Sequence, residues 1–303
     1  MEAWRSKVEK LVKISPTHVT FIGFGEAAQA ILSGWGRDRP ASIVAFDVKT
    51  DQPASRVAKL ADYHAHDVAD GQTAADAVTS ATMVFSVVTA DQALAAAKAA
   101  VPGMRSGTIW LDCNSCAPET KRQAAQVITA AGGHYVDVAV MAPVHPKLHR
   151  VPMLLAGPDA DHAAEILKAL DMCPKVAGPE VGHASSIKMI RSVMIKGMEA
   201  LSAECLLAAR KAGVEDEVIA SLNASNPEID WRTKGAYNLE RMMVHGERRA
   251  AEMREVAKTV AELGLPDRLS RETAVWQDEI AALDVDPEED SLVDRLDRIL
   301  GAM

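Results

Sequence analysis

Short apolar runs alternate with helix-like segments up to about Gly178. HVTFIGFG opens with β-branched and aromatic residues, turns on glycines and continues into alanine-rich helical spacing, which predicts a strand, a tight turn and a helix. SIVAFDV, TMVFSVVTA and GTIWLDCNS are similar buried-strand runs; a mixed, partly helical segment follows the first and a helix follows each of the others. Strands that alternate with helices predict a parallel sheet with right-handed crossovers, so the expected fold class is α/β, with a doubly wound Rossmann-type domain.

The end of this domain is marked by two more strand-like runs, HYVDVAVMA and PMLLAGP. A predicted helix from Asp159 to Leu170 and the run CPKVAGP complete it. After Gly178 the pattern changes, because the segment from Ala184 to Ala212 contains no proline and is apolar on most faces. A helix that is hydrophobic nearly all round is typically buried, so a long buried helix is predicted here.

The remainder of the chain is helical in pattern, with breaks at Asn226-Pro227, Gly264-Leu265-Pro266 and Asp286-Pro287. A homodimer is expected, because one chain offers too few partners to cover the apolar faces of the long helix. The predicted organisation is an N-terminal helical extension over 1–16, a dinucleotide-binding Rossmann domain over 17–178 and an all-helical substrate and dimerisation domain over 179–303.

Charge and hydropathy exclude several classes of protein. The net charge is −9 and no basic stretch is clustered, which argues against a binder of duplex nucleic acid. No segment has the ~20 consecutive apolar residues of a membrane span, and the first residues are charged and periodic rather than uniformly apolar as in a signal peptide. A soluble, cytoplasmic protein without a nucleic-acid or membrane partner is therefore expected.

The chain has four cysteines, and reduced thiols are expected in a chain too long to depend on disulfides. Cys113 and Cys116 form a C-x-x-C, but no second C-x-x-C or paired histidines accompany them, and a zinc site needs three or four ligands. We expect packing residues of a loop and no metal; a redox pair is the alternative.

A glycine turn follows the first predicted strand, in the order Gly23-Phe24-Gly25-Glu26-Ala27-Ala28. It fits G-x-G-x-x-A: the first glycine permits the tight turn, the second lets the backbone approach a pyrophosphate, and the small Ala28 lets helix and strand pack closely. The amino end of the helix adds unpaired N–H donors for the anion. The residues predicted to bind the cofactor here are Gly23, Phe24, Gly25, Glu26 and Ala27.

Asp47 ends the second predicted strand, about twenty residues after the glycines, where a carboxylate can accept hydrogen bonds from the adenosine ribose. This favours NAD as cofactor. NADP is the alternative if Lys49 and Arg56 face the ribose. The alternative interpretation is a glycine-rich turn in another α/β protein, with Asp47 merely capping a strand; the agreement of motif, context and acid disfavours it.

A second group of polar residues lies in GPEVGHASSIKMIRSVMIKG. Lys188, Ser192 and Lys196 recur every fourth residue and share one helix face, with Arg191 nearby. Burying unpaired cations is costly, so either these side chains reach solvent or acidic partners, or they serve an anionic substrate and a catalytic lysine.

In these motifs the sequence resembles the β-hydroxyacid dehydrogenase family, which includes 3-hydroxyisobutyrate and 6-phosphogluconate dehydrogenases, and within it a phosphogluconate dehydrogenase-like branch. The resemblance covers nearly the whole chain and rests on GFGEAA, LDCNSCAP, VAVMAPV and VGHASSIKMIRS. It implies that Lys188 is the catalytic lysine and that Asn114 and Ser115 lie in a substrate-binding loop facing the nicotinamide. It also implies that Val88 and Thr89 border the cofactor.

The chain departs from the family pattern at two places. Ser192, preceded by Arg191, stands where the family usually has asparagine one turn after the lysine. His145-Pro146-Lys147 follows APV, where the family usually has Ser-Gly-Gly. Together with His149 and Lys196, these residues could form a cationic pocket for a carboxylate or a phosphorylated acid. The predicted substrate-binding residues are Asn114, Ser115, His145, Lys147, Arg191, Ser192 and Lys196.

These observations predict an NAD(P)-dependent oxidoreductase that oxidises the hydroxyl group of a small anionic acid of the 3-hydroxy acid type, phosphorylated or not, with Lys188 as proton-transfer group. Two alternatives stay open. One is imine-reductase-like reduction of a C=N bond, which a lysine beside carboxylate-binding cations disfavours. The other is a dinucleotide-binding protein without catalysis, which the altered positions Ser192 and His145-Pro146-Lys147 leave open.

Overall fold

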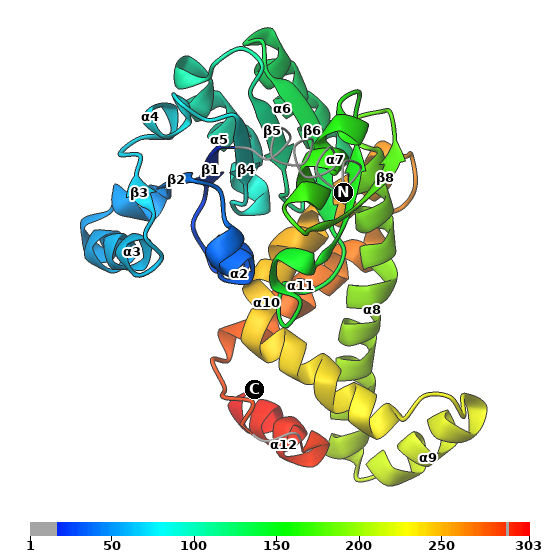
Figure 1. Cartoon of the computed structure of the whole chain (residues 1–303). Helices are drawn as coiled ribbons and strands as arrows, with labels where there is room; N and C mark the ends of the chain where they lie inside the picture. Colours follow the sequence, from blue (N-terminus) through cyan, green and yellow to red (C-terminus); the bar gives the residue numbers. More distant parts are fainter. Residues whose placement is uncertain (1–16, 289–290) are drawn as a thin grey trace, which may run out of the picture. The chain divides into compact units, whose positions relative to one another are not determined.

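An eight-stranded sheet organises the first half of the chain in the computed structural model, which describes residues 17–288 and 291–303 (Figure 1). Within these residues the strand order is β3-β2-β1-β4-β5-β6-β7-β8. The predicted helical extension over 1–16 lies outside the described residues. The strands are β1 His18–Ile22, β2 Ser42–Phe46, β3 Ala69–Asp70, β4 Met83–Ser86, β5 Ile109–Asp112, β6 His134–Val140, β7 Pro152–Ala156 and β8 Cys173–Gly178.

The helices of this region connect successive strands, as the alternating pattern predicts. The sequence pattern did not indicate the short strand β3 or the short helix that follows it. The helices are α2 Glu26–Trp35, α3 Pro53–Ala65, α4 Ala74–Val78, α5 Ala93–Ala100, α6 Pro118–Ala130 and α7 Ala160–Ala169, and short 3-10 turns include η2 Val48–Thr50, η3 Ala90–Gln92 and η5 Leu148–Arg150.

The sheet is parallel except at one pair of strands. β6 and β7 run antiparallel, with Val138 opposite Leu155, so the expectation of a wholly parallel sheet was wrong at this point. An antiparallel neighbour needs no crossover helix, and the link between β6 and β7 holds only the turn η5. That link contains the His145-Pro146-Lys147 segment.

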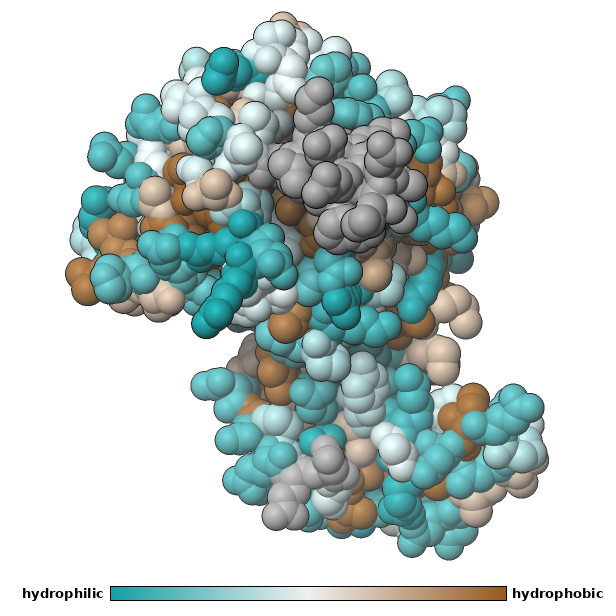
Figure 2. Space-filling model, viewed as in Figure 1, coloured by the Kyte–Doolittle hydropathy of each residue, from teal (hydrophilic) through white to brown (hydrophobic). Residues whose placement is uncertain are grey.

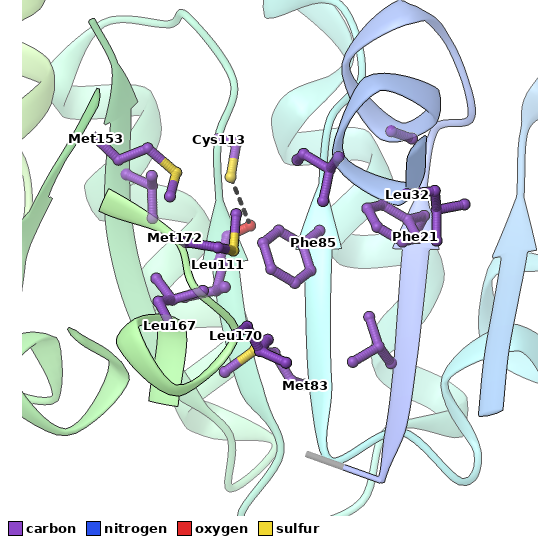
Figure 3. Close-up of a cluster of buried hydrophobic side chains, with 14 of the residues drawn as sticks. Phe21, Leu32, Met83, Phe85, Leu111, Cys113, Met153, Leu167, Leu170 and Met172 are labelled. Carbon is purple, nitrogen blue, oxygen red and sulfur yellow. Dashed lines mark hydrogen bonds between the residues drawn. The ribbon is translucent and has the colours of Figure 1, made fainter. Parts of the chain in front are cut away.

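The core of this region covers both faces of the sheet. Along β4, Met83 and Phe85 belong to one apolar cluster and Val84 to the other; along β5, Leu111 and Trp110 divide in the same way. Successive strand residues point to opposite faces, so continuous apolar strands are buried on both sides. Figure 3 shows the first cluster, which also includes Phe21, Leu32, Cys113, Met153, Leu167, Leu170 and Met172.

The described chain divides into two compact units, one ending at Lys188 and the other beginning at Met189. The sequence pattern changes earlier, at Gly178. The difference arises because the first turn of the next helix packs with the sheet: Ala184 shares an apolar cluster with Ala139 and Ala156.

The second unit is all helical, as predicted, and its predicted breaks coincide with the links between helices. Small residues let two of the helices approach closely, because a Cβ on Gly246 of α10 would lie 2.4 Å from the carbonyl oxygen of Gln277 in α11. The helices are α8 His183–Ala212, which begins in the first unit, α9 Glu215–Ser225, α10 Trp231–Glu262, α11 Arg268–Ala282 and α12 Leu292–Ala302.

The sequence pattern predicts that the long helix α8 is buried on nearly all faces. Within this chain that prediction is wrong, because part of the helix is exposed. Ile190, Met194 and Leu201 are 50%, 65% and 69% exposed. In the view of Figure 2, apolar patches also interrupt the polar surface of both units. No helix within residues 17–288 or 291–303 combines the length and apolar character that crossing a bilayer requires.

Candidate active site

The turn between β1 and α2 has room for an anion. Gly23 has a φ of +89°, and a Cβ there would lie 2.6 Å from the carbonyl oxygen of Val87, so only glycine fits. Gly25 precedes α2, and a Cβ there would meet no heavy atom within 4 Å. No side chain caps the helix, and the N–H groups at such a helix amino end can bind an anion. The geometry fits the pyrophosphate of a dinucleotide.

Phe24, between the two glycines, is fixed from both sides. Its N–H donates to Asp47 Oδ2 at 2.8 Å, and its carbonyl accepts from Lys59 Nζ at 2.8 Å. Its buried ring packs edge-on against Tyr63, with centroids 5.0 Å apart. The sequence pattern did not indicate Lys59 as a residue of this site. The available signal was its spacing of four from Tyr63, with which it forms the buried face of α3.

Asp47 therefore has a structural role beside the cofactor role predicted for it. Its Oδ1 accepts from the N–H of Lys49 at 3.0 Å and so caps the turn η2. The Arg56 guanidinium donates to the carbonyl of Thr50 at 2.7 Å. These bonds leave Asp47 able to bind the ribose as well, because each carboxylate oxygen can accept a second hydrogen bond. Ribose recognition by Asp47 stays a prediction.

Val88 and Asn114 join the ends of two neighbouring strands. The N–H of Val88, after β4, donates to Asn114 Oδ1 at 2.7 Å, and Asn114 Nδ2 donates to Ser86 Oγ at 2.9 Å. Asn114 is buried, and Thr89 begins the turn η3. These ends lie beside the glycine turn, where the strand order reverses between β1 and β4; open α/β sheets bind ligands at such a point.

A buried polar cluster lies behind this loop. Asp112 Oδ1 accepts from Asn114 Nδ2 at 2.8 Å and from Lys121 Nζ at 3.0 Å, while Tyr135 donates to Asp112 Oδ2 at 2.7 Å. Lys121 Nζ also lies 3.4 Å from Asp137 Oδ1. Burial alone would lower the pKa of Lys121, but the two carboxylates outweigh it and raise that pKa. Burial, followed by the same carboxylates, raises the pKa of Tyr135.

Lys188 reaches the predicted substrate loop. Its Nζ donates to Ser115 Oγ at 2.6 Å, although the two residues are 73 positions apart in sequence. Both side chains belong to the first unit. The structure thus brings together the lysine and the serine that the family resemblance assigns to one site.

Other predicted residues have different surroundings. His145 and Lys147 are exposed on the link between β6 and β7. His149 is buried against α2: a Cβ on Gly34 would lie 2.1 Å from its Nδ1, and its Nε2 lies 3.6 Å from Asp171. His149 therefore packs in the fold instead of joining a substrate pocket.

In the second unit, Lys196 is buried and ion-paired with Glu252 at 2.5 Å, with Ser192 Oγ 3.5 Å from its Nζ. The expectation that cations on this helix find acidic partners holds for Lys196. Arg191 is exposed. Substrate binding by these three residues of α8 stays a prediction.

Cys113 and Cys116 form no disulfide and are buried in different apolar clusters. Burial raises the pKa of Cys113 to about 12. Within the part of the chain that the structure describes, no group of three or more His, Cys, Asp or Glu residues is placed to hold a metal ion.

Two family models match the chain. Residues 18–178 match the NAD binding domain of 6-phosphogluconate dehydrogenase, and residues 209–280 match a domain of unknown function, DUF1932.

Solved structures of similar chains support these matches. A conserved hypothetical protein from Sinorhizobium meliloti 1021 is 37% identical, with 95% of this chain and 97% of that chain covered and a TM-score of 0.73. A conserved protein of unknown function, described as structurally similar to 3-hydroxyacid dehydrogenases, is 32% identical, with 88% and 98% covered and a TM-score of 0.66. The 3-hydroxyisobutyrate dehydrogenase of Mycobacterium tuberculosis, solved with L-serine, is 16% identical, with 94% and 98% covered and a TM-score of 0.70; it shares the fold.

Proposed function

Because this chain belongs to the family that carries the NAD binding domain of 6-phosphogluconate dehydrogenase, we propose that it reversibly oxidises the hydroxyl group of a small anionic hydroxy acid. The proposed substrate is of the 3-hydroxy acid type, with or without a phosphate group. The cofactor is NAD(P), and Asp47 supports NAD as the preferred form.

The observation that carries this proposal is the 2.6 Å hydrogen bond from Lys188 to Ser115. Ser115 follows Asn114, whose side chain is bonded to the N–H of Val88. Val88 in turn lies against the glycine turn, since a Cβ on Gly23 would be 3.0 Å from Val88 Cγ1. A continuous series of contacts therefore runs from the glycine turn through Val88, Asn114 and Ser115 to Lys188.

In the proposed mechanism the nicotinamide, when bound, supplies the hydride acceptor. Lys188 Nζ accepts the proton of the substrate hydroxyl group, while the hydrogen on the hydroxyl-bearing carbon leaves as hydride. The alcohol thereby becomes a carbonyl. Ser115 orients Nζ, and Asn114 fixes the loop beside the cofactor. Lys188 then releases the proton to water.

We propose that His145 and Lys147 bind the anionic group of the substrate, since both are exposed donors in the link that departs from the family pattern. The sequence also supports substrate binding by Arg191, Ser192 and Lys196, which lie on one stretch of α8. Lys196 is the weakest of them, because Glu252 already neutralises it.

We further propose a homodimer that buries the exposed face of α8. A cytoplasmic setting is proposed as well. This proposal rests on the sequence, in which a chain of 303 residues with four cysteines does not depend on disulfides.

Turnover with a panel of substrates tests this function. Hydroxy acids that include 3-hydroxyisobutyrate and 6-phosphogluconate are assayed with NAD and with NADP, and cyclic imines with the reduced cofactors. Oxidation of a hydroxy acid is expected. Reduction of imines alone would instead favour the imine-reductase alternative, and dinucleotide binding without any turnover would favour a non-catalytic protein.

A further inference from the structure

Lys121 is a buried cation that takes no part in the proposed chemistry. It lies on α6, and its side chain is 0% exposed, as are those of Asp112 and Asp137. A charge enclosed in this way is stable only if its partners compensate for the lost water.

The two carboxylates around Lys121 stand side by side. Asp112 and Asp137 are register partners on the neighbouring strands β5 and β6, so they project to the same face of the sheet. Like charges in this arrangement repel each other. Lys121 Nζ lies 3.0 Å from one carboxylate and 3.4 Å from the other, and it also donates to the carbonyl of Asp112 at 2.5 Å.

Each carboxylate holds a different part of the candidate active site. Asp112 Oδ1 accepts from both the N–H and the side-chain amide of Asn114, at 3.0 and 2.8 Å, and so fixes the loop that presents Ser115. Asp137 Oδ2 accepts from the N–H of Gly182 at 3.1 Å and from the N–H and hydroxyl of Ser185 at 3.0 and 3.1 Å.

By accepting these bonds, Asp137 fixes the start of α8 at Gly182 and Ser185, and Ser185 lies three residues before Lys188. Lys121 therefore connects Asp112, which supports the loop of Ser115, with Asp137, which supports the helix turn before Lys188. The contacts all lie within the first unit.

We propose that Lys121 is a positioning residue: by holding Asp112 and Asp137 together, it sets the approach of Lys188 Nζ to Ser115 Oγ. The catalytic consequence rests on the proposed function, whereas the positioning itself does not.

Two variants test the connection at different strengths. Lys121→Met keeps the length of the side chain and removes the cation, but it leaves two buried carboxylates and can prevent folding. Ser185→Ala removes a single hydroxyl donor to Asp137 and keeps the backbone bonds. Ser186→Ala is the matched control, because the neighbouring serine makes no described side-chain bond to Asp137.

The readout is the reactivity of Lys188 in the full-length protein without substrate or cofactor. The protein is labelled with trace acetic anhydride, and acetylation of Lys188 is measured by peptide mass spectrometry against the exposed Lys98 and Lys175. We expect Lys188 labelling to rise about threefold in Ser185→Ala, the size of one lost hydrogen bond, and about tenfold in Lys121→Met. Ser186→Ala should match the wild type.

Lys188 labelling equal to wild type in folded Ser185→Ala would overturn the proposal, whether or not Lys121→Met folds. Equal increases in Ser185→Ala and Ser186→Ala would also overturn it, because the effect would then be general loosening of the helix. Turnover is measured separately with the panel above. A labelling change combined with undiminished turnover in Lys188→Ala would reject the proposed function and leave the positioning role intact.

Discussion

Lys59 Nζ donates a 2.8 Å hydrogen bond to the carbonyl oxygen of Phe24, the residue between the two glycines of the turn after β1. The opposite side of the same peptide segment is held by Asp47. A turn fixed at both its N–H and its carbonyl presents the amino end of α2 to a pyrophosphate with a smaller loss of backbone entropy on binding.

We expect Lys59→Met to raise the Kd for the dinucleotide about three- to tenfold, as loss of one charge-assisted hydrogen bond from the turn would do. Lys59 also pairs with Asp62 at 2.6 Å, so Asp62→Asn serves as the control that removes only the ion pair. Titration of protein fluorescence measures both. Equal weakening in the two variants would mean that the ion pair, and not the bond to Phe24, maintains the turn.

Replacement of Lys188 separates proton transfer from charge. Lys188→Ala should lower kcat by ~10²–10⁴ while dinucleotide binding stays intact, because the glycine turn does not depend on this side chain. Lys188→Arg keeps the charge but cannot release a proton near neutral pH, so substrate affinity should return without the rate. An arginine variant nearly as active as wild type would point to His145 or Lys196 as proton acceptor.

NAD should bind more tightly than NADP, because the carboxylate of Asp47 repels a 2′-phosphate. Asp47→Asn removes the charge and keeps an acceptor for the N–H of Phe24, but it loses the acceptor for the N–H of Lys49. It should therefore weaken NAD binding more than NADP binding and so narrow the ratio of the two Kd values. Fluorescence titration of both dinucleotides measures the ratio. Tighter NADP binding by the wild type would assign that pocket to Lys49 or Arg56 instead.

The strands and the glycine turn could be predicted because their signals are local. Continuous apolar runs such as that around Phe85 indicate strands buried on both faces, and Gly23 needs a conformation that only glycine adopts easily. The pairing of Ser115 with Lys188 could be anticipated only from the family resemblance. No spacing rule relates residues 73 positions apart.

The parts that the sequence did not predict depend on distant partners. Lys121 stands among polar residues in PETKRQAAQ, and its burial follows from two carboxylates on strands that meet only in the folded sheet. The antiparallel direction of β7 was missed for a similar reason, because an apolar run carries no information about strand direction. The apolar character of α8 indicated burial, but a sequence does not distinguish burial within one chain from burial against another.

Cys113 should make the fold sensitive to alkaline pH. Burial raises its pKa to about 12, above the ~8.5 of an unfolded cysteine, so its contribution to stability is complete below pH ~8.5 and is lost as pH rises toward 12. Between pH 8 and 10.5 the free energy of unfolding should therefore fall by up to about 2.5 kcal/mol more in wild type than in Cys113→Ala. Urea denaturation under reducing conditions measures this.

The exposed Cys173 supplies the control for that experiment. Cys173→Ala should follow the wild type across the same pH range. The buried tyrosines Tyr63 and Tyr135 also have raised pKa values, mainly through burial, but they are present in every variant and cancel in the comparison. Parallel curves for wild type and Cys113→Ala would show that the Cys113 thiol is accessible to solvent.

The exposed apolar residues of α8 predict a homodimer. Ile190, Met194 and Leu201 recur at spacings of four and seven, so they form one stripe along the helix. A Cβ on Gly197, within this stripe, would meet no atom within 4 Å, so the surface at this position is open. A contiguous exposed apolar stripe typically marks a surface that another protein chain covers.

Light scattering after size exclusion at micromolar concentration should give twice the chain mass for the wild type. Met194→Glu should shift the protein toward monomer, because a carboxylate in the centre of an apolar interface loses its water without a partner. Val57→Glu is the matched control. Val57 is 79% exposed on α3, so this substitution introduces the same negative charge on the surface of a different helix. A wild type that is monomeric, or a Met194→Glu variant as dimeric as Val57→Glu, would show that the stripe is not the dimer interface.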